Sequence, residues 1–233
     1  YPGLLTGHAF IDRAEQQLAS AAIFACLVFQ IDGQAGSDPE QPKLDPVDAH
    51  QKAAKLFDVF CKNNQGSWGL INSGLFGAFF EGKNASQCLR LVHKFQDKLI
   101  KQTGITVSAG LAEYPTLSYQ PAEMLTNALK ALDHATFFGP GSTAIFDTVT
   151  LNISGDRLFD KGDIQGSISE FQLALKLNPS NLNVHNSLGV CYGLLGDYEK
   201  AKKEFNSAIR LKAKAVMPWY NLGFTVMLDG EHR

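Results

Sequence analysis

Glycine and phenylalanine residues that recur at a constant interval constrain the fold of this chain more than any other feature. Gly155, Gly189 and Gly223 are evenly spaced, and Phe171 and Phe205 stand the same interval apart. A period of about 34 residues is typical of helical-hairpin repeats, whose units cannot bury their apolar faces alone and therefore stack. We expect an all-α array from about residue 149 onward.

One copy of the repeat, "NSLGVCYGLLGDYEKAKKEFNSAIRL", resembles the tetratricopeptide repeat. The motif positions of that family are occupied by Leu188, Gly189, Tyr192, Gly196, Ala201, Phe205 and Ala208. The resemblance implies that residues 149–233 hold two full repeats and, in "PWYNLGFTVMLDGEHR", the first helix of a third. Glycine at 155 and 189 is expected to let paired helices approach closely, with Phe171 and Phe205 filling the space between them.

Residues 1–148 read differently, because strand and helix signals alternate. "IFACLVFQID" and "ITVSAGLAEY" predict strands, and "INSGLFGAFFEG" predicts a hairpin with a tight turn. "DPVDAHQKAAKLFDVFCKN" predicts a helix that Asp45 caps, and Gly104 is expected to end the helix before the ITVSAG strand. The order α, β, α, β, β, α, β, α, β predicts an α+β sheet domain of the ferredoxin-like kind over residues 1–148.

Three segments of this first domain resemble GGDEF domains, the bacterial diguanylate cyclases. "LLTGHAFIDR" is similar to the opening of that family, "ITVSAGLAEYP" to its SxGxxxxP strand, and "LTNALKALDHATFFGPG" to its last helix. The resemblance implies a nucleotide-cyclase-like sheet. A relative from the wider class III nucleotide cyclases would share this sheet and stays open as an alternative.

The catalytic positions that the resemblance implies carry neutral side chains here. That family holds its metal ions with carboxylates at the end of the first strand and in the GGDEF turn, because divalent cations need charged oxygen ligands. In "FQID" Gln30 takes the place of the first carboxylate, and neither register of the turn, "NSGLF" or "SGLFG", contains an acid. Thr136 replaces the phosphate-binding lysine and Leu129 the acid of the last helix. We expect no catalysis, no metal and no cofactor.

Two remnants could still bind a nucleotide weakly. Asp32 survives at the strand end, where a lone acid is more often a loop cap, and the backbone amides at Gly74 could cradle a phosphate. A residual GTP-binding sensor, or an enzyme of the diguanylate cyclase type, is therefore the alternative function.

The inner groove of the repeats is the favoured binding surface. Asn152, Asn186 and Tyr220 occupy equivalent positions in successive repeats, and Asn183 and Phe224 are expected to line the same surface. Such a row can pair with an extended peptide, whereas the basic residues of a carboxylate clamp are missing from it. The alternative is an ordinary exposed polar face.

Composition excludes several other classes of function. A formal charge of −2 gives no attraction for nucleic acid, and the apolar run "AAIFACLVFQI" is too short to span a membrane. The four cysteines are widely spaced, which suits buried thiols in a reducing compartment. Tyr1 is not an initiator Met, which indicates an excised fragment. We expect a bacterial, cytoplasmic, non-catalytic signalling or scaffold protein that binds protein or peptide partners through its repeats.

Overall fold

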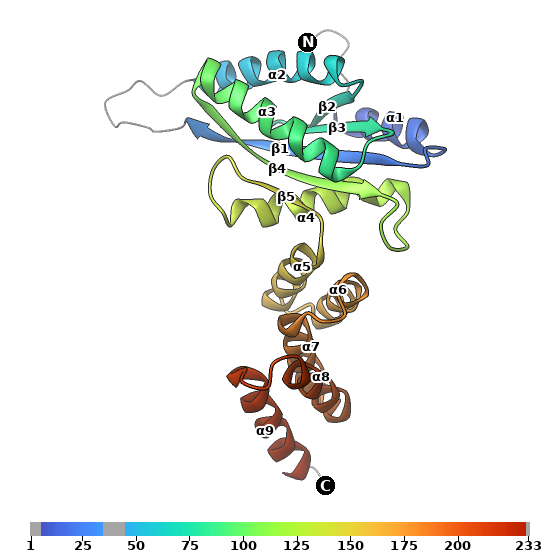
Figure 1. Cartoon of the computed structure of the whole chain (residues 1–233), viewed down its shortest axis with the longest axis vertical. Coiled ribbons are helices and arrows are strands. Elements are labelled where there is room, and N and C mark those ends of the chain that lie inside the picture. Colours follow the sequence, from blue (N-terminus) through green and yellow to red (C-terminus); the bar gives the residue numbers. More distant parts are fainter. Residues whose placement is uncertain (1–5, 35–44, 232–233) are drawn as a thin grey trace, which may run out of the picture. The chain divides into compact units, whose positions relative to one another are not determined.

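The computed structural model describes residues 6–34 and 45–231. The chain divides into two compact units, Tyr1–Phe146 and Asp147–Arg233, and each is described here by itself. The first unit is a sheet with helices, and the second consists of helices (Figure 1). None of the described helices is both long and apolar enough to cross a bilayer.

The elements of the first unit follow the predicted order, with a short 3₁₀ turn added before the last helix. They are α1 (His8–Leu18), β1 (Phe24–Gln34), α2 (Pro46–Asn63), β2 (Ser67–Asn72), β3 (Leu75–Glu81), α3 (Ala85–Thr103), β4 (Ile105–Tyr114), η1 (Pro121–Glu123), α4 (Met124–Thr136) and β5 (Thr143–Ile145). The strands form one sheet in the order β2-β3-β1-β4-β5. Among these described strands β4 and β5 pair in parallel, and the other neighbours are antiparallel. The predicted α+β architecture is confirmed.

Local signals explain where the helices of this unit begin and end. The Asp45 carboxylate accepts a hydrogen bond from the Val47 amide at the start of α2. Asn84 and Gln87 form a reciprocal capping box at the start of α3, and Gly104 ends that helix with φ at 71°. The segment that resembles the family's last helix extends past Gly139, whereas α4 ends at Thr136 and a turn follows it.

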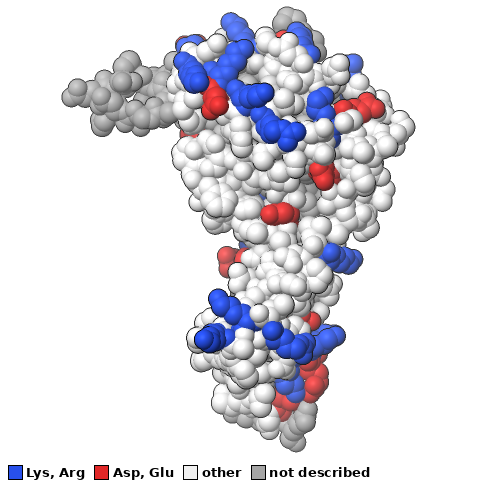
Figure 2. Space-filling model, in the orientation of Figure 1, with Lys and Arg blue, Asp and Glu red and all other residues white. Residues whose placement is uncertain are grey.

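The sheet is covered on both faces, because successive side chains of a strand point to opposite sides. On one face α2 and α3 pack on an aromatic core in which the Phe29 ring lies 4.6 Å from Phe57 and 4.5 Å from Phe76, measured between ring centroids (Figure 1). Each such buried ring stabilises the fold by about 2 kcal/mol. Figure 2 shows basic side chains gathered on the surface of this unit, and Lys94 and Lys98 of α3 are exposed.

The opposite face holds α4 so closely that one strand residue must be glycine. A Cβ on Gly110 would lie 2.1 Å from the carbonyl oxygen of Ala128 and 2.1 Å from the amide nitrogen of Leu132. Helix–sheet packing therefore requires the glycine of the SxG motif in β4. Its presence needs no catalytic explanation.

The second unit is a series of antiparallel helices. They are α5 (Thr148–Asp160), α6 (Ile164–Leu177), α7 (Leu182–Leu194), α8 (Tyr198–Leu211) and α9 (Val216–Glu231). A side-chain oxygen caps each of the first four, from Asp147, Asp163, Asn181 and Asp197. The helical array predicted from the repeat period is confirmed.

Two glycines allow the paired helices of each repeat to approach, as predicted. A Cβ on Gly155 would lie 2.5 Å from the ring of Phe171, and one on Gly189 would lie 2.6 Å from the ring of Phe205. Both rings are buried. The aromatic side chain of the second helix therefore sits directly on the glycine of the first.

Candidate functional site

The first candidate surface is the edge of the sheet around the β2–β3 turn. Gln30 of β1 lies opposite Leu75 of β3 and, on its other side, opposite Ser108 of β4. We expected Gln30 near the end of its strand, but β1 continues to Gln34. The β1 position and the turn position at which the cyclase resemblance implies carboxylates are cross-strand neighbours. In this chain they present an amide and an aliphatic side chain.

The two sequence-predicted remnants are each engaged with a different segment. Asp32 accepts a hydrogen bond from the backbone amide of Gly141, at 2.8 Å, and so fixes the loop between α4 and β5. The Gly74 amide donates to the side-chain oxygen of Asn72, at 3.0 Å, within the turn itself. The loop-cap role weighed for Asp32 matches this geometry, and the Gly74 amide already has an acceptor.

No group of three or more His, Cys, Asp or Glu side chains within the described residues is arranged to hold a metal ion. On the last helix of the sheet unit, Thr136 donates its hydroxyl hydrogen to the Asp133 carbonyl. The four cysteines are free and buried, and burial raises the pKa of the Cys88 thiol to about 11. Thiols held in the protonated form are poor nucleophiles.

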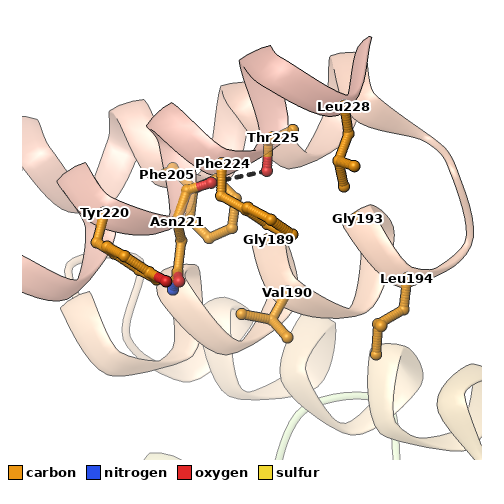
Figure 3. Close-up of a pocket in the computed structure, with 10 residues that line it drawn as sticks. All are labelled: Gly189, Val190, Gly193, Leu194, Phe205, Tyr220, Asn221, Phe224, Thr225 and Leu228. Atoms are coloured by element: carbon orange, nitrogen blue, oxygen red, sulfur yellow. Dashed lines mark hydrogen bonds between the residues drawn. The ribbon is translucent and has the colours of Figure 1, made fainter. Parts of the chain in front are cut away.

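The second candidate surface is a pocket of about 280 Å³ between α7 and α9 of the repeat unit (Figure 3). Ten residues line it: Gly189, Val190, Gly193, Leu194, Phe205, Tyr220, Asn221, Phe224, Thr225 and Leu228. None of them carries a charge. Tyr220 is 67% exposed and Phe224 is 51% exposed, so large apolar groups at this site face solvent.

Figure 3 shows how the pocket is shaped. Phe224 and Tyr220 project from α9, and Val190 projects from α7 on the opposite side. At the floor, the Phe205 ring occupies the space beside Gly189, and Gly193 contributes no side chain. The Thr225 hydroxyl is turned back to the Asn221 carbonyl at 2.8 Å, which leaves the lining mostly apolar.

The structure brings together only some of the groove residues predicted from the sequence. Tyr220 and Phe224 both line the pocket. Asn186 lies at its margin, where its side-chain oxygen accepts a hydrogen bond from the Asn221 amide group at 3.0 Å. Asn183 is exposed and is not among the lining residues.

Two amides of the predicted row, those of Asn152 and Asn186, form hydrogen bonds within the repeats. Asn152 donates to the Asp156 carboxylate at 3.0 Å, one turn along its own helix. Burial, with the nearby charge of Asp160, raises the pKa of Asp156. The groove is polar at its α5 end and apolar at its α9 end.

Sequence reasoning missed the α7 side of the pocket. Val190 and Leu194 are the positions one and two turns after Asn186, and they stand one repeat before Phe224 and Leu228. The signal was the helical spacing i, i+4, i+8 combined with the repeat period. Applied to Asn186 and Tyr220, this spacing identifies four of the lining residues, namely Val190, Leu194, Phe224 and Leu228.

Comparisons with known proteins agree with both halves of the structure. Residues 155–196 match a family model described as TPR repeat, and residues 182–214 match one described as tetratricopeptide repeat. The first unit is similar to the GGDEF domain of DgcB from Caulobacter crescentus, solved in complex with c-di-GMP, with a TM-score of 0.52 and 17% identity. The chain carries a GGDEF-like fold followed by tetratricopeptide repeats.

The similarity extends over most of the DgcB domain. The aligned region spans 61% of this chain and 91% of that DgcB domain. A second structure, the coiled coil and GGDEF domain of the same protein, matches with a TM-score of 0.50 at 16% identity, over 61% of this chain and 81% of that one. No curated protein matches this sequence. At these identities the likeness establishes the fold of the GGDEF-like domain.

Proposed function

We propose that this chain is a non-catalytic binding protein, which holds a peptide segment of a partner in the groove between α7 and α9. The observation that carries the proposal is the pocket in which Tyr220 and Phe224 remain exposed next to Val190. Large apolar side chains left in solvent beside a preformed hollow are typical of interaction sites.

The size and the lining of the pocket indicate which kind of side chain it can bind. Its volume of about 280 Å³ lies just below the range of roughly 300–1,000 Å³ for small-molecule sites, so it suits one large side chain. Its uncharged lining favours an apolar anchor such as Leu, Phe or Trp. The Asn186–Asn221 pair at the margin supplies an amide group for the backbone that flanks the anchor.

A random peptide library displayed on phage and panned on the whole chain tests this proposal. Enriched sequences are expected to share one large apolar residue, and a fluorescent peptide made from them is expected to bind at least 10-fold more weakly to Phe224→Ala. Phe138→Ala is the matched control, because Phe138 is a 70% exposed phenylalanine in the first unit. Enrichment of acidic or unrelated sequences, or equal weakening by both variants, would contradict the proposal.

We propose in addition that the GGDEF-like domain makes no cyclic dinucleotide. Transfer of a phosphoryl group needs cations, and the carboxylates that hold them, to stabilise the developing charge. The cross-strand pair Gln30 and Leu75 provides neither at the positions that the family resemblance implies. The domain then serves as a folded scaffold for the repeats.

An assay with GTP and Mg²⁺ or Mn²⁺, read by chromatography, is expected to show no protein-dependent product. Calorimetry with GTP separates the alternative, a nucleotide sensor, from a silent domain. Saturable heat that weakens in Gly74→Val would support the sensor, whereas no heat at micromolar concentrations supports the scaffold. Formation of a cyclic dinucleotide by the purified wild-type chain would refute the proposal of catalytic silence.

The four buried free thiols fit a reducing compartment. We therefore place the protein in the cytoplasm as part of this proposal. Fractionation of cells that express the parent protein would test the assignment, and recovery from an oxidising compartment would contradict it.

A further inference from the structure

The outward sides of α2 and α3 form a basic surface that peptide binding in the groove does not use. These two helices cover the same face of the sheet, and Figure 2 shows basic side chains gathered on this unit. Together they carry seven Lys or Arg residues and three acids, a formal charge of +4 in a chain of −2. We call this surface the basic face and define it by six exposed side chains: Lys52, Lys55, Arg90, Lys94, Lys98 and Lys101.

Helical spacing places these cations on one side of each helix. On α3 they run from Arg90 to Lys101 at intervals of four, four and three residues, which gives a stripe about 17 Å long. On α2, Lys52 and Lys55 lie one turn apart. The buried residues of both helices point the other way, into the aromatic core on the sheet. The two stripes therefore both face solvent, on helices that contact each other.

The positive charges of the basic face are not neutralised within the described part of the chain. None of the six side chains forms an ion pair there, whereas Lys62 of α2 is paired with Asp58 at 2.6 Å. Asp97, the acid of α3, is exposed and has no ion pair among the described residues either. Like charges one turn apart, such as Arg90 and Lys94, repel each other and destabilise a helix. An anionic surface laid against the face would offset this repulsion.

The types of side chain on the basic face indicate which kind of anion it fits. Five of its six cations are lysines, which act as flexible point charges, whereas the planar guanidinium of arginine suits directional contacts with nucleic acids. The phenylalanines of α2 and α3 are buried or half-buried, so a base has no such ring to stack on. Protein interfaces are likewise depleted in lysine and enriched in aromatic residues and arginine. These features favour a fluid anionic surface over either macromolecule.

We propose that the basic face docks the first domain on the surface of a bilayer that contains anionic lipids. Each Lys or Arg near such a surface adds an attraction that does not depend on the exact position of the headgroups. Val59 of α2 and Ile100 of α3 are 43% and 37% exposed, and aliphatic side chains of this kind can contact the headgroup region. The association is peripheral, because charge rather than a membrane-spanning helix holds it.

The test measures binding of the whole chain to lipid vesicles by co-sedimentation. One set of vesicles contains phosphatidylserine and phosphatidylcholine in equal parts, and the other contains phosphatidylcholine alone. Binding to the anionic vesicles is expected to be at least 10-fold tighter, and it should be lost in about 1 M salt, where the Debye length is about 3 Å. Phe224→Ala should bind the vesicles as the wild type does, which keeps this test independent of the groove.

Charge reversal on the basic face should weaken binding to the anionic vesicles. Lys94→Glu combined with Lys98→Glu is expected to weaken it at least 10-fold. Lys212→Glu combined with Lys214→Glu is the matched control, because it changes the net charge equally at two exposed lysines of the repeat unit. A second variant, Lys94→Gln combined with Lys98→Gln, removes the two charges without adding acids and should weaken binding at least 3-fold.

The outcomes that would overturn the proposal are distinct. Equal binding to both kinds of vesicle, or equal weakening by the Lys94→Glu and Lys98→Glu variant and its control, would show that the face does not recognise anionic lipid. Titrations with a fluorescent DNA duplex and with a poly-glutamate peptide cover the other anions. Tighter binding to either of these than to the vesicles, lost in the same variant, would assign the basic face to a nucleic acid or a protein and would also overturn the proposal.

Discussion

The two candidate sites, the β2–β3 turn and the α7–α9 groove, differ in whether their functional groups already have partners within the molecule. At the β2–β3 turn the Gly74 amide donates a hydrogen bond to the Asn72 side chain. In β1, Asp32 accepts a hydrogen bond from the Gly141 amide. At the α7–α9 groove, Tyr220 and Phe224 are left in solvent. Polar groups that are paired internally have little left to offer a ligand, while an exposed aromatic side chain gains free energy when a partner covers it.

Under the proposal of catalytic silence, this domain keeps its fold without a catalytic site. The glycine at position 110 is required by the approach of α4, and the aromatic core around Phe29 holds the sheet together. Both are needed for folding whether or not the domain binds a nucleotide. The side chains of Gln30 and Leu75 carry no such packing demand, and they stand at the positions where we propose that the catalytic carboxylates are missing.

The largest effect is expected at Gly110. Gly110→Ala places a Cβ 2.1 Å from two backbone atoms of α4, which cannot move without displacing the helix, so the domain should lose more than about 3 kcal/mol of stability. Gly74→Ala should change the free energy of unfolding by less than about 0.5 kcal/mol, since nothing lies near its Cβ. Urea unfolding of both variants measures the contrast. A severe loss in Gly74→Ala would mean that the turn is structurally constrained after all.

A smaller effect separates the closed and open glycines of the repeats. Gly189→Ala should destabilise the chain by about 1–3 kcal/mol, because its Cβ would lie 2.6 Å from the Phe205 ring. Gly223→Ala should stabilise it by up to about 1 kcal/mol through helix propensity. Thermal unfolding followed by circular dichroism compares them. Equal destabilisation by the two substitutions would contradict the open space next to Gly223.

Asn186 should contribute modestly to partner binding. Asn186→Ala removes the acceptor of the Asn221 amide at the margin of the pocket. It should weaken binding of the panned peptide by about 1 kcal/mol and leave the helical circular dichroism spectrum unchanged. Anisotropy titration measures the loss. The matched control is Asn183→Ala, which alters an exposed amide outside the pocket lining and should bind as the wild type does. A larger loss in Asn183→Ala would place the peptide elsewhere on the repeats.

The smallest effect concerns pH. The hydrogen bond with Glu204 raises the pKa of His185 above the ordinary value of 6.5, with burial and Arg210 opposing it. The protonated form is thus favoured in the folded state. Its stabilisation is fully present below pH 6.5 and is lost as the pH rises through the raised folded pKa. Denaturation of the wild type and of Glu204→Gln between pH 5.5 and 8.5 tests this: the variant should lack that decline, and an identical decline would assign it to another group.

The sequence predicts the repeat phase well, because Gly155, Gly189 and Gly223 mark equivalent positions and the chain must stack its helices at that period. It also predicts the succession of strands along the first domain from their apolar runs. The register of the hairpin could not be predicted, because "NSGLF" and "SGLFG" align equally well with the family's turn. The strand pairing in the structure places Leu75 opposite Gln30. Registers depend on side chains from distant segments, which local patterns do not contain.

The groove illustrates the same limit. The period places Asn152, Asn186 and Tyr220 in one row, but it does not show that Asn152 is bonded to Asp156 and Asn186 to Asn221. Those bonds depend on rotamers and on neighbouring helices. An amide that is already paired contributes less to a ligand than its position suggests, whereas Phe224 remains available.

The central claim is that the partner binds in the repeat groove and not on the cyclase-like sheet domain. Its most direct test is a titration of the panned fluorescent peptide against wild type, Phe224→Ala and Val47→Ala. Val47 of α2 is 64% exposed, and together with Leu70 and Ser73 it lines a separate pocket of about 390 Å³ beside the β2–β3 turn. We predict at least 10-fold weaker binding for Phe224→Ala and unchanged binding for Val47→Ala. Unchanged binding by Phe224→Ala together with loss in Val47→Ala would place the partner on the cyclase-like domain and contradict the account.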